Sequence, residues 1–251
     1  MTISPNKWEL DVQGYLNVCN ITTATPRKQI RDFSAGVNDL GLWNSMVCWP
    51  LRSSQNYGSG TTAFSLGGLG TYNGLLVGGP TWAVDGSGVT FTIGVAQGIS
   101  TGLTGNHANQ TVMAFANLAE ISTNNYRLIA PQNGGYDGDL MLTTSAGIAE
   151  WRFGLSFAPV LAGQATTGWS TFAGAKTGFT FTGTINAASA STTVETNTSV
   201  AIGIGGSNRT DTTFPGTIAA ALYVSSHIAA SAVQNLRTLY KSTLGTGLSL
   251  P

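Results

Sequence analysis

Short runs of β-branched and aromatic residues, separated by glycine, asparagine and serine, make up most of the chain from about residue 47 onward. The runs span residues 75–77, 89–95, 111–118, 126–130, 139–143, 151–157, 178–185, 199–204 and 216–224. In one of them Phe179 and Phe181 alternate with Thr180 and Thr182, which is the period of a strand with one buried face. No long helical pattern separates the runs, so the spacing predicts an all-β, antiparallel β-sandwich rather than a parallel α/β sheet.

Two helical patterns flank this β-rich region. The first starts at Thr25-Pro26, which places a cap residue before a proline at the first helical position. Apolar residues then follow at spacings of three or four, at Ile30, Phe33, Val37 and Leu40. The second follows a cap at Ser226 and returns an apolar residue every three or four positions up to residue 240. We expect an amphipathic helix before the sandwich and a short helix after it.

The first 24 residues show no helical period, and Trp8, Leu10 and Val12 alternate like a short strand. They predict an arm whose apolar side chains have no room in a complete sandwich and therefore contact another chain. The predicted assembly residues are Trp8, Leu10, Val12, Leu16, Ile30 and Phe33. For the helix, the main domain is the alternative partner surface. This divides the chain into residues 1–44, an arm and amphipathic helix for attachment, and residues 45–251, the sandwich.

The amino-acid composition excludes some classes of function. The 251 residues are 42% hydrophobic, enough for one domain with a real core, and only 9% are charged, with 11 basic and 11 acidic side chains. A net charge of zero excludes the usual basic groove for nucleic acid, because phosphate binding needs clustered Lys and Arg. No leader peptide and no membrane-spanning stretch are visible. Cys19 and Cys48 are expected to be reduced thiols.

Three segments carry a family resemblance. Residues 73–91 read N-G-L-L-V-G-G-P-T-W-A-V-D-G-S-G-V-T-F, which resembles the opening of concanavalin A-like, laminin-G-type domains. Residues 109–120 are similar to a middle strand of that family, and residues 214–224, with the helix after them, to its closing strand. The resemblance covers about residues 45 to 245 and implies a jelly-roll sandwich.

The flanking segments have a narrower likeness. Residues 33–46 and 239–251 are similar to those of laminin-G-like proteins of tailed bacteriophages. This resemblance implies a virion structural protein, a tail fibre, spike or capsid decoration, made in the host cytoplasm without a signal peptide. It would contact other virion proteins and copies of itself, as a trimer if it is a fibre or spike, and adhere to host-surface glycan.

Catalytic patterns are scarce. The sandwich class includes glycan hydrolases, which need two carboxyl groups beside the sugar bond, but no Glu-x-Asp-x-Glu strand occurs. The nearest approach is Asp137-Gly138-Asp139, with Glu150 beyond it. Asp137 and Asp139 form either a turn or a calcium site, and calcium is the only cofactor that the sequence suggests. We therefore predict that the protein is not an enzyme, with a polysaccharide hydrolase or lyase and a stand-alone cellular lectin as alternatives.

Aromatic residues in loop-like segments are candidates for sugar stacking, because an aromatic face offers apolar area beside a polar edge. Trp169 lies in such a segment, between Gly168 and Ser170. Together with Tyr136 and Asp137 it forms the predicted glycan site. The alternative for Trp169 is packing within a loop or against another subunit.

Overall fold

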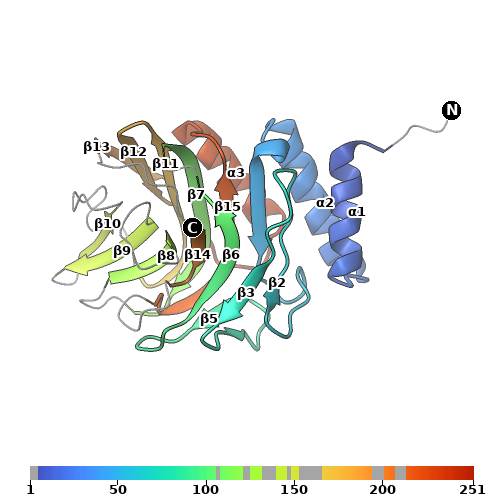
Figure 1. Cartoon of the computed structure of the whole chain (residues 1–251), viewed down its shortest axis with the longest axis horizontal. Helices are drawn as coiled ribbons and strands as arrows, with labels where there is room; N and C mark the ends of the chain where they lie inside the picture. The colour runs from blue at the N-terminus through green and yellow to red at the C-terminus, as the bar shows by residue number, and fades with distance from the viewer. Residues whose placement is uncertain are drawn as a thin grey trace.

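The computed structural model describes residues 5–105, 108–120, 125–131, 140–145, 148–152, 166–193, 201–206 and 213–251. Two antiparallel sheets lie face to face, and three α-helices lie along one side of the pair (Figure 1). The all-β sandwich expected from the sequence is thus confirmed. In the described part of the chain, no helix is both long enough and apolar enough to cross a membrane.

The larger sheet, sheet A, has the strand order β13-β12-β11-β7-β15-β5-β4, with β1 also paired to β15. β1 pairs with the second half of β15 and β5 with the first half, so both strands flank the same edge of β15. The strands of sheet A are β1 (Met46–Pro50), β4 (Thr81–Trp82), β5 (Val89–Phe91), β7 (Asn109–Leu118), β11 (Gly168–Thr177), β12 (Thr180–Ile185), β13 (Ala188–Thr193) and β15 (Gly216–Val224).

The smaller sheet, sheet B, has the order β10-β9-β8-β14-β6-β3-β2. Its strands are β2 (Thr62–Ala63), β3 (Gly74–Val77), β6 (Gly98–Thr104), β8 (Asn125–Pro131), β9 (Leu140–Ser145), β10 (Ile148–Arg152) and β14 (Ala201–Ile204). The glycine-rich segment 59–70 therefore contributes the two-residue strand β2.

Both faces of sheet A are buried, and the two faces belong to different hydrophobic clusters. In β7, Val112 and Ala114 face sheet B, whereas Met113 and Phe115 face the helices. In β15 a bulge between Ile218 and Ala220 shifts this alternation by one residue. Strands buried on both faces have almost continuous apolar sequences, which is why the runs at 111–118 and 216–224 are so rich in apolar residues.

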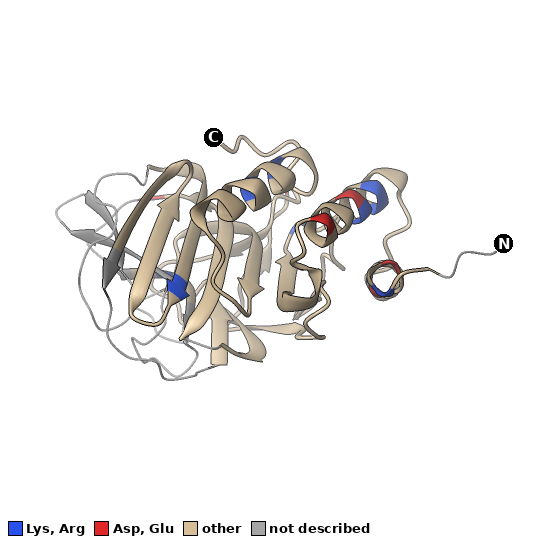
Figure 2. Ribbon diagram, turned by 90° about the horizontal axis from the view of Figure 1, so that it is seen from above, with Lys and Arg blue, Asp and Glu red and all other residues tan. Residues whose placement is uncertain are grey.

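The helices form the third layer of the fold. They are α1 (Lys7–Val18), α2 (Ala24–Asp39) and α3 (Ala230–Ser242), with the short 3-10 helix η1 (Trp43–Ser45) leading into β1. Seen from above, α2 and α3 lie beside the sandwich and α1 lies outside α2 (Figure 2). The same view shows that most of the coloured charged residues lie on the helices.

Two predictions about the helices are wrong. The expected N-terminal arm is helix α1, in which the Glu9 carboxylate accepts a hydrogen bond from the Asn6 backbone N–H at 2.7 Å and so closes the first turn. α3 begins at Ala230 rather than near Ser226, although Val233 and Tyr240 are buried as its period predicted.

Glycine at position 36 fixes how closely two helices approach. α2 runs through Gly36 without a break, and a Cβ at this position would come 2.5 Å from Leu239 of α3. The absence of a side chain at Gly36 therefore lets α2 and α3 pack against each other.

Both cysteines are free thiols, as expected, and both are buried. Burial raises the pKa of Cys19 from 9.0 to about 12, against a smaller lowering by its hydrogen bond with Tyr15, and also raises the pKa of Cys48. We therefore expect neither thiol to react with Ellman's reagent at pH 8 until the protein unfolds, because the thiolate is the nucleophile.

The same pKa shift has a consequence for stability. The folded state keeps the Cys19 proton to higher pH than the unfolded state does, so the free energy of unfolding should fall as pH rises from about 9 towards 12. Urea titrations across this pH range test the decline.

The prediction for Ellman's reagent has its own contrary outcome. Rapid labelling of the native protein at pH 8 would show that the two thiols are accessible.

Candidate functional site

Of the residues predicted to bind glycan or metal, Trp169 is the one that lies within the described structure. Trp169 lies at the start of β11, opposite Asn117 of β7, and is half-buried against the cluster on the helix side of sheet A. For Trp169, packing rather than sugar stacking is the alternative given by the sequence, and here the side chain packs within its own chain. Tyr136, Asp137 and Asp139 lie outside the described residues, so the predicted glycan and calcium sites stay predictions.

Four of the six predicted assembly residues are buried within the chain itself. The cluster between the helices and sheet A contains Val12, Leu16, Ile30 and Phe33. These side chains can pack there because the outer face of sheet A is apolar rather than exposed to solvent. Leu10 is 58% exposed and Trp8 is half-buried. The outer face of sheet A thus supplies the partner surface that these apolar residues need, while contact with another chain stays a prediction.

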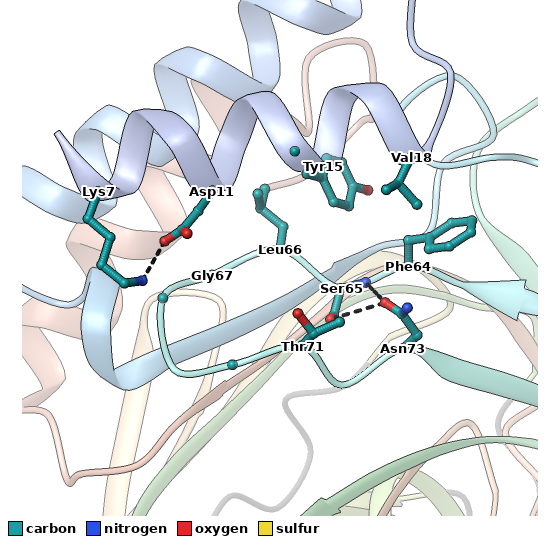
Figure 3. Close-up of a pocket in the computed structure, with 13 residues that line it drawn as sticks. Lys7, Asp11, Tyr15, Val18, Phe64, Ser65, Leu66, Gly67, Thr71 and Asn73 are labelled. Atoms are coloured by element: carbon teal, nitrogen blue, oxygen red, sulfur yellow. Dashed lines mark hydrogen bonds and ion pairs between the residues drawn. The ribbon is translucent and has the colours of Figure 1, made fainter. Parts of the chain in front are cut away.

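A groove lies between α1 and the loop that joins β2 to β3 (Figure 3). We call it the helix–loop groove, and its volume is about 450 Å³. It is lined by Lys7, Asp11, Gly14, Tyr15 and Val18 of α1 and by Phe64, Ser65, Leu66, Gly67, Gly68, Gly70, Thr71 and Asn73 of the loop. The volume falls within the range of about 300–1,000 Å³ that is usual for small-molecule sites.

Glycines allow the loop to lie flat against the strand below it. A Cβ on Gly67, whose φ is +142°, would come 2.2 Å from the carbonyl oxygen of Met46, and one on Gly68 would come 2.6 Å from the Trp43 ring. Between the loop and β1, Leu66 and Cys48 exchange two backbone hydrogen bonds of 2.7 and 2.8 Å. The floor of the groove is therefore backbone held close to β1.

The far end of the loop is held by side chains. The Asn73 Oδ1 accepts hydrogen bonds from the backbone N–H of Ser65 at 3.0 Å and from its hydroxyl at 3.3 Å (Figure 3). The Ser65 hydroxyl in turn accepts one from the Tyr72 backbone N–H at 2.8 Å. Asn73 is thereby oriented with its amide nitrogen unused by any described residue.

The helix side of the groove carries its charged groups. Lys7 Nζ lies 2.7 Å from Asp11 Oδ2, and the same oxygen accepts a hydrogen bond from Trp43 Nε1 at 3.1 Å. These contacts fix the Asp11 carboxylate against η1 and leave Oδ1 without a partner in the described part of the chain. Asp11 is the only acid among the lining residues.

The other end of the groove is apolar and aromatic. The Tyr15 hydroxyl donates a hydrogen bond of 2.6 Å to the backbone carbonyl of Gln55, and burial raises its pKa well above 10.0, so it stays neutral. Phe64 packs edge-on against Tyr57, with ring centroids 6.4 Å apart. The groove thus combines an apolar wall with an amide, a hydroxyl and a carboxylate.

Neither paired carboxylates nor a metal site is seen at the groove. A glycoside-hydrolysing pair needs two carboxyl groups, and this groove has Asp11 alone. Across the described ranges, no three His, Cys, Asp or Glu side chains are grouped as metal ligands would be. What the groove can do chemically, with the groups that line it, is form hydrogen bonds and apolar contacts.

Sequence reasoning missed this groove, although part of its signal was present. Val12, Tyr15, Leu16 and Cys19 are buried at the spacing i, i+3, i+4, i+7 of an amphipathic helix. Gly14 and the alternation at residues 8–12 obscured that period. Nothing local, however, indicates that α1 should lie over residues 64–73.

Comparison with known proteins identifies solved structures of similar fold. No protein-family model and no curated protein sequence matches the chain. Among solved structures, it is similar to Trypanosoma rangeli sialidase in complex with 2,3-difluoro-KDN, with a TM-score of 0.61 and 12% identity over 88% of this chain and 40% of that one. A mutant of that sialidase with trans-sialidase activity gives 0.60 and 12% over 88% and 39%, and the complex with sialic acid gives 0.57 and 13% over the same shares.

At this level of identity the likeness shows the fold alone. The chain spans about two fifths of the length of these sialidases. The prediction that the protein is not an enzyme is nevertheless contradicted by these matches, because solved chains with a similar fold include sialidases. They give no support to a virion role, which stays an expectation from the sequence resemblance.

Proposed function

We propose that the protein binds carbohydrate in the helix–loop groove. One observation carries the proposal: an aromatic and apolar wall faces polar groups without described partners, the Asn73 amide nitrogen, the Thr71 hydroxyl and the Asp11 Oδ1. Sugars present both hydroxyl groups and apolar C–H faces, so such a lining complements them. The fold shared with sialidases, including one solved with sialic acid, adds support.

The amide of Asn73 is the group best placed for recognition. Its oxygen is committed to Ser65, which orients the amide, while its nitrogen remains available as a donor. A preoriented donor loses little conformational entropy on binding, so it contributes more to affinity than a flexible one does.

Replacing Asn73 with alanine is therefore expected to weaken glycan binding about tenfold, because a hydrogen bond to the ligand is lost and Ser65 is freed. Glycan-array screening followed by calorimetry on the best glycan measures the loss. Asn235→Ala is the matched control, since Asn235 is exposed on α3 and lines a different hollow. Equal binding by the Asn73→Ala variant and the wild type would remove the groove from the proposal.

An enzyme acting on polysaccharide is the second candidate, and the sialidase-like fold favours it. Its candidate acids are Asp137, Asp139 and Glu150. The same glycans, incubated with the protein and analysed for released sugars, distinguish cleavage from binding alone. Released sugar that persists after all three acids are replaced would exclude them.

The finer proposal, that the sandwich is displayed on a bacteriophage particle, rests on the sequence resemblance. Contacts with other virion proteins and with further copies of the chain, trimeric in a fibre or spike, belong to it. The exposed Leu10 beside the half-buried Trp8 offers an apolar position for such a contact.

A further inference from the structure

The charges that line the helix–loop groove cancel each other. Lys7 is its only cation and Asp11 its only anion, and the two lie 2.7 Å apart, one helical turn from each other on α1 (Figure 3). The Trp43 indole N–H also donates to Asp11 and holds the carboxylate in place. A ligand in the groove therefore meets no net charge.

An acidic sugar would need something different. A sugar carboxylate is recognised by an unpaired cation, or by an arginine that donates two parallel hydrogen bonds. No arginine lines this groove, and Lys7 is engaged with Asp11. A sugar carboxylate placed near Lys7 would also lie close to the Asp11 carboxylate and be repelled by it.

Neutral sugar hydroxyls fit the groups that remain. The Asn73 amide nitrogen donates, the Asp11 Oδ1 accepts, and the Thr71 hydroxyl does either. Each can pair with a sugar hydroxyl without any charge being left uncompensated.

We infer that the groove selects neutral glycans and discriminates against sialylated ones, even though solved structures of similar fold include sialidases. The inference rests on the proposed function of the groove and specifies its ligand class. The Lys7–Asp11 pair is the specificity element, because it neutralises the only cation that could attract a sugar carboxylate.

The test uses an array on which each neutral glycan is printed beside its sialylated counterpart. The wild type is expected to bind the neutral members about tenfold more strongly than their sialylated partners. Asp11→Asn keeps an oxygen for the Trp43 N–H but leaves Lys7 unpaired, so the preference should shrink to about twofold or less. Asp32→Asn is the matched control, because Asp32 forms the same i, i+4 pair with Lys28 on α2, outside the groove, and should leave the preference unchanged.

The wild type alone provides a second measurement. Binding of a neutral glycan should change less than about twofold between about 0.05 and 0.5 M NaCl, because salt screens only charged contacts. This measurement uses no variant, so it tests the inference even if the Asp11→Asn protein does not fold.

The outcomes separate the inference from the proposed function. Sialylated glycans that bind as strongly as neutral ones, and lose binding in Asn73→Ala, would overturn the inference and leave the groove as the site. Absence of binding to either class, or binding that ignores Asn73→Ala, would overturn the proposed function and the inference with it.

Discussion

Replacing Phe33 with alanine should lower the free energy of unfolding by about 3–5 kcal/mol, the usual cost of removing a fully buried phenylalanine ring. Phe33 of α2 has no exposed surface and packs edge-on against Tyr240 of α3, with centroids 6.4 Å apart. Tyr240 stacks on Phe115 of β7 at 3.5 Å. The three rings connect both helices to sheet A, so their loss should loosen the helical layer as well.

Phe179→Ala is the control for this variant. The Phe179 side chain is 59% exposed in the turn between β11 and β12, so its loss should change stability by no more than about 0.5 kcal/mol. Urea unfolding of both variants gives the comparison. A Phe33→Ala protein within about 1 kcal/mol of the wild type would mean that α2 does not pack on sheet A as described.

Gly67→Ala should cost about 2–4 kcal/mol, for two separable reasons. A φ of +142° belongs to a region that is almost restricted to glycine, and the added Cβ would collide with the backbone carbonyl of Met46. The loop would have to lift from β1, which would break the Leu66–Cys48 hydrogen bonds and deform the groove.

Gly60→Ala separates the two costs. Gly60 also has a positive φ, +69°, but nothing lies within 4 Å of an added Cβ, so only the backbone strain of about 1–2 kcal/mol is expected. Thermal or urea unfolding of the two variants measures the difference. If Gly67→Ala costs no more than Gly60→Ala, the close approach of the loop to β1 is not what the structure describes.

The sandwich could be predicted because its signals are local. The apolar runs at 111–118 and 216–224 identify β7 and β15 almost to the residue, and turn-forming residues separate most of the others. What the runs could not show is that both faces of sheet A are covered. A strand of apolar residues is compatible with a neighbouring sheet, with helices or with another subunit. If the sandwich is taken as complete without the helices, Val12 has no place in it and is predicted to contact another chain, while Ile30 has either another chain or the main domain as its partner.

The helix α1 could have been predicted and the groove could not. Asn6 and Glu9 give the start signal of a helix, and the buried residues from Val12 to Cys19 follow its period. The groove, in contrast, needs Asp11 and Asn73 on opposite walls, and that pairing depends on where α1 docks.

The sequence by itself determined that this chain forms an antiparallel sandwich with helices at both ends, because alternation, turn residues and helical period act over a few neighbouring residues. Only the tertiary structure decided that the N-terminal helices cover the outer face of sheet A and that α1 closes a groove over the 64–73 loop. Those contacts join residues that are far apart in the sequence. Hydrophobic burial drives them, and because burial is non-directional, the pattern of apolar residues alone does not say which surfaces meet.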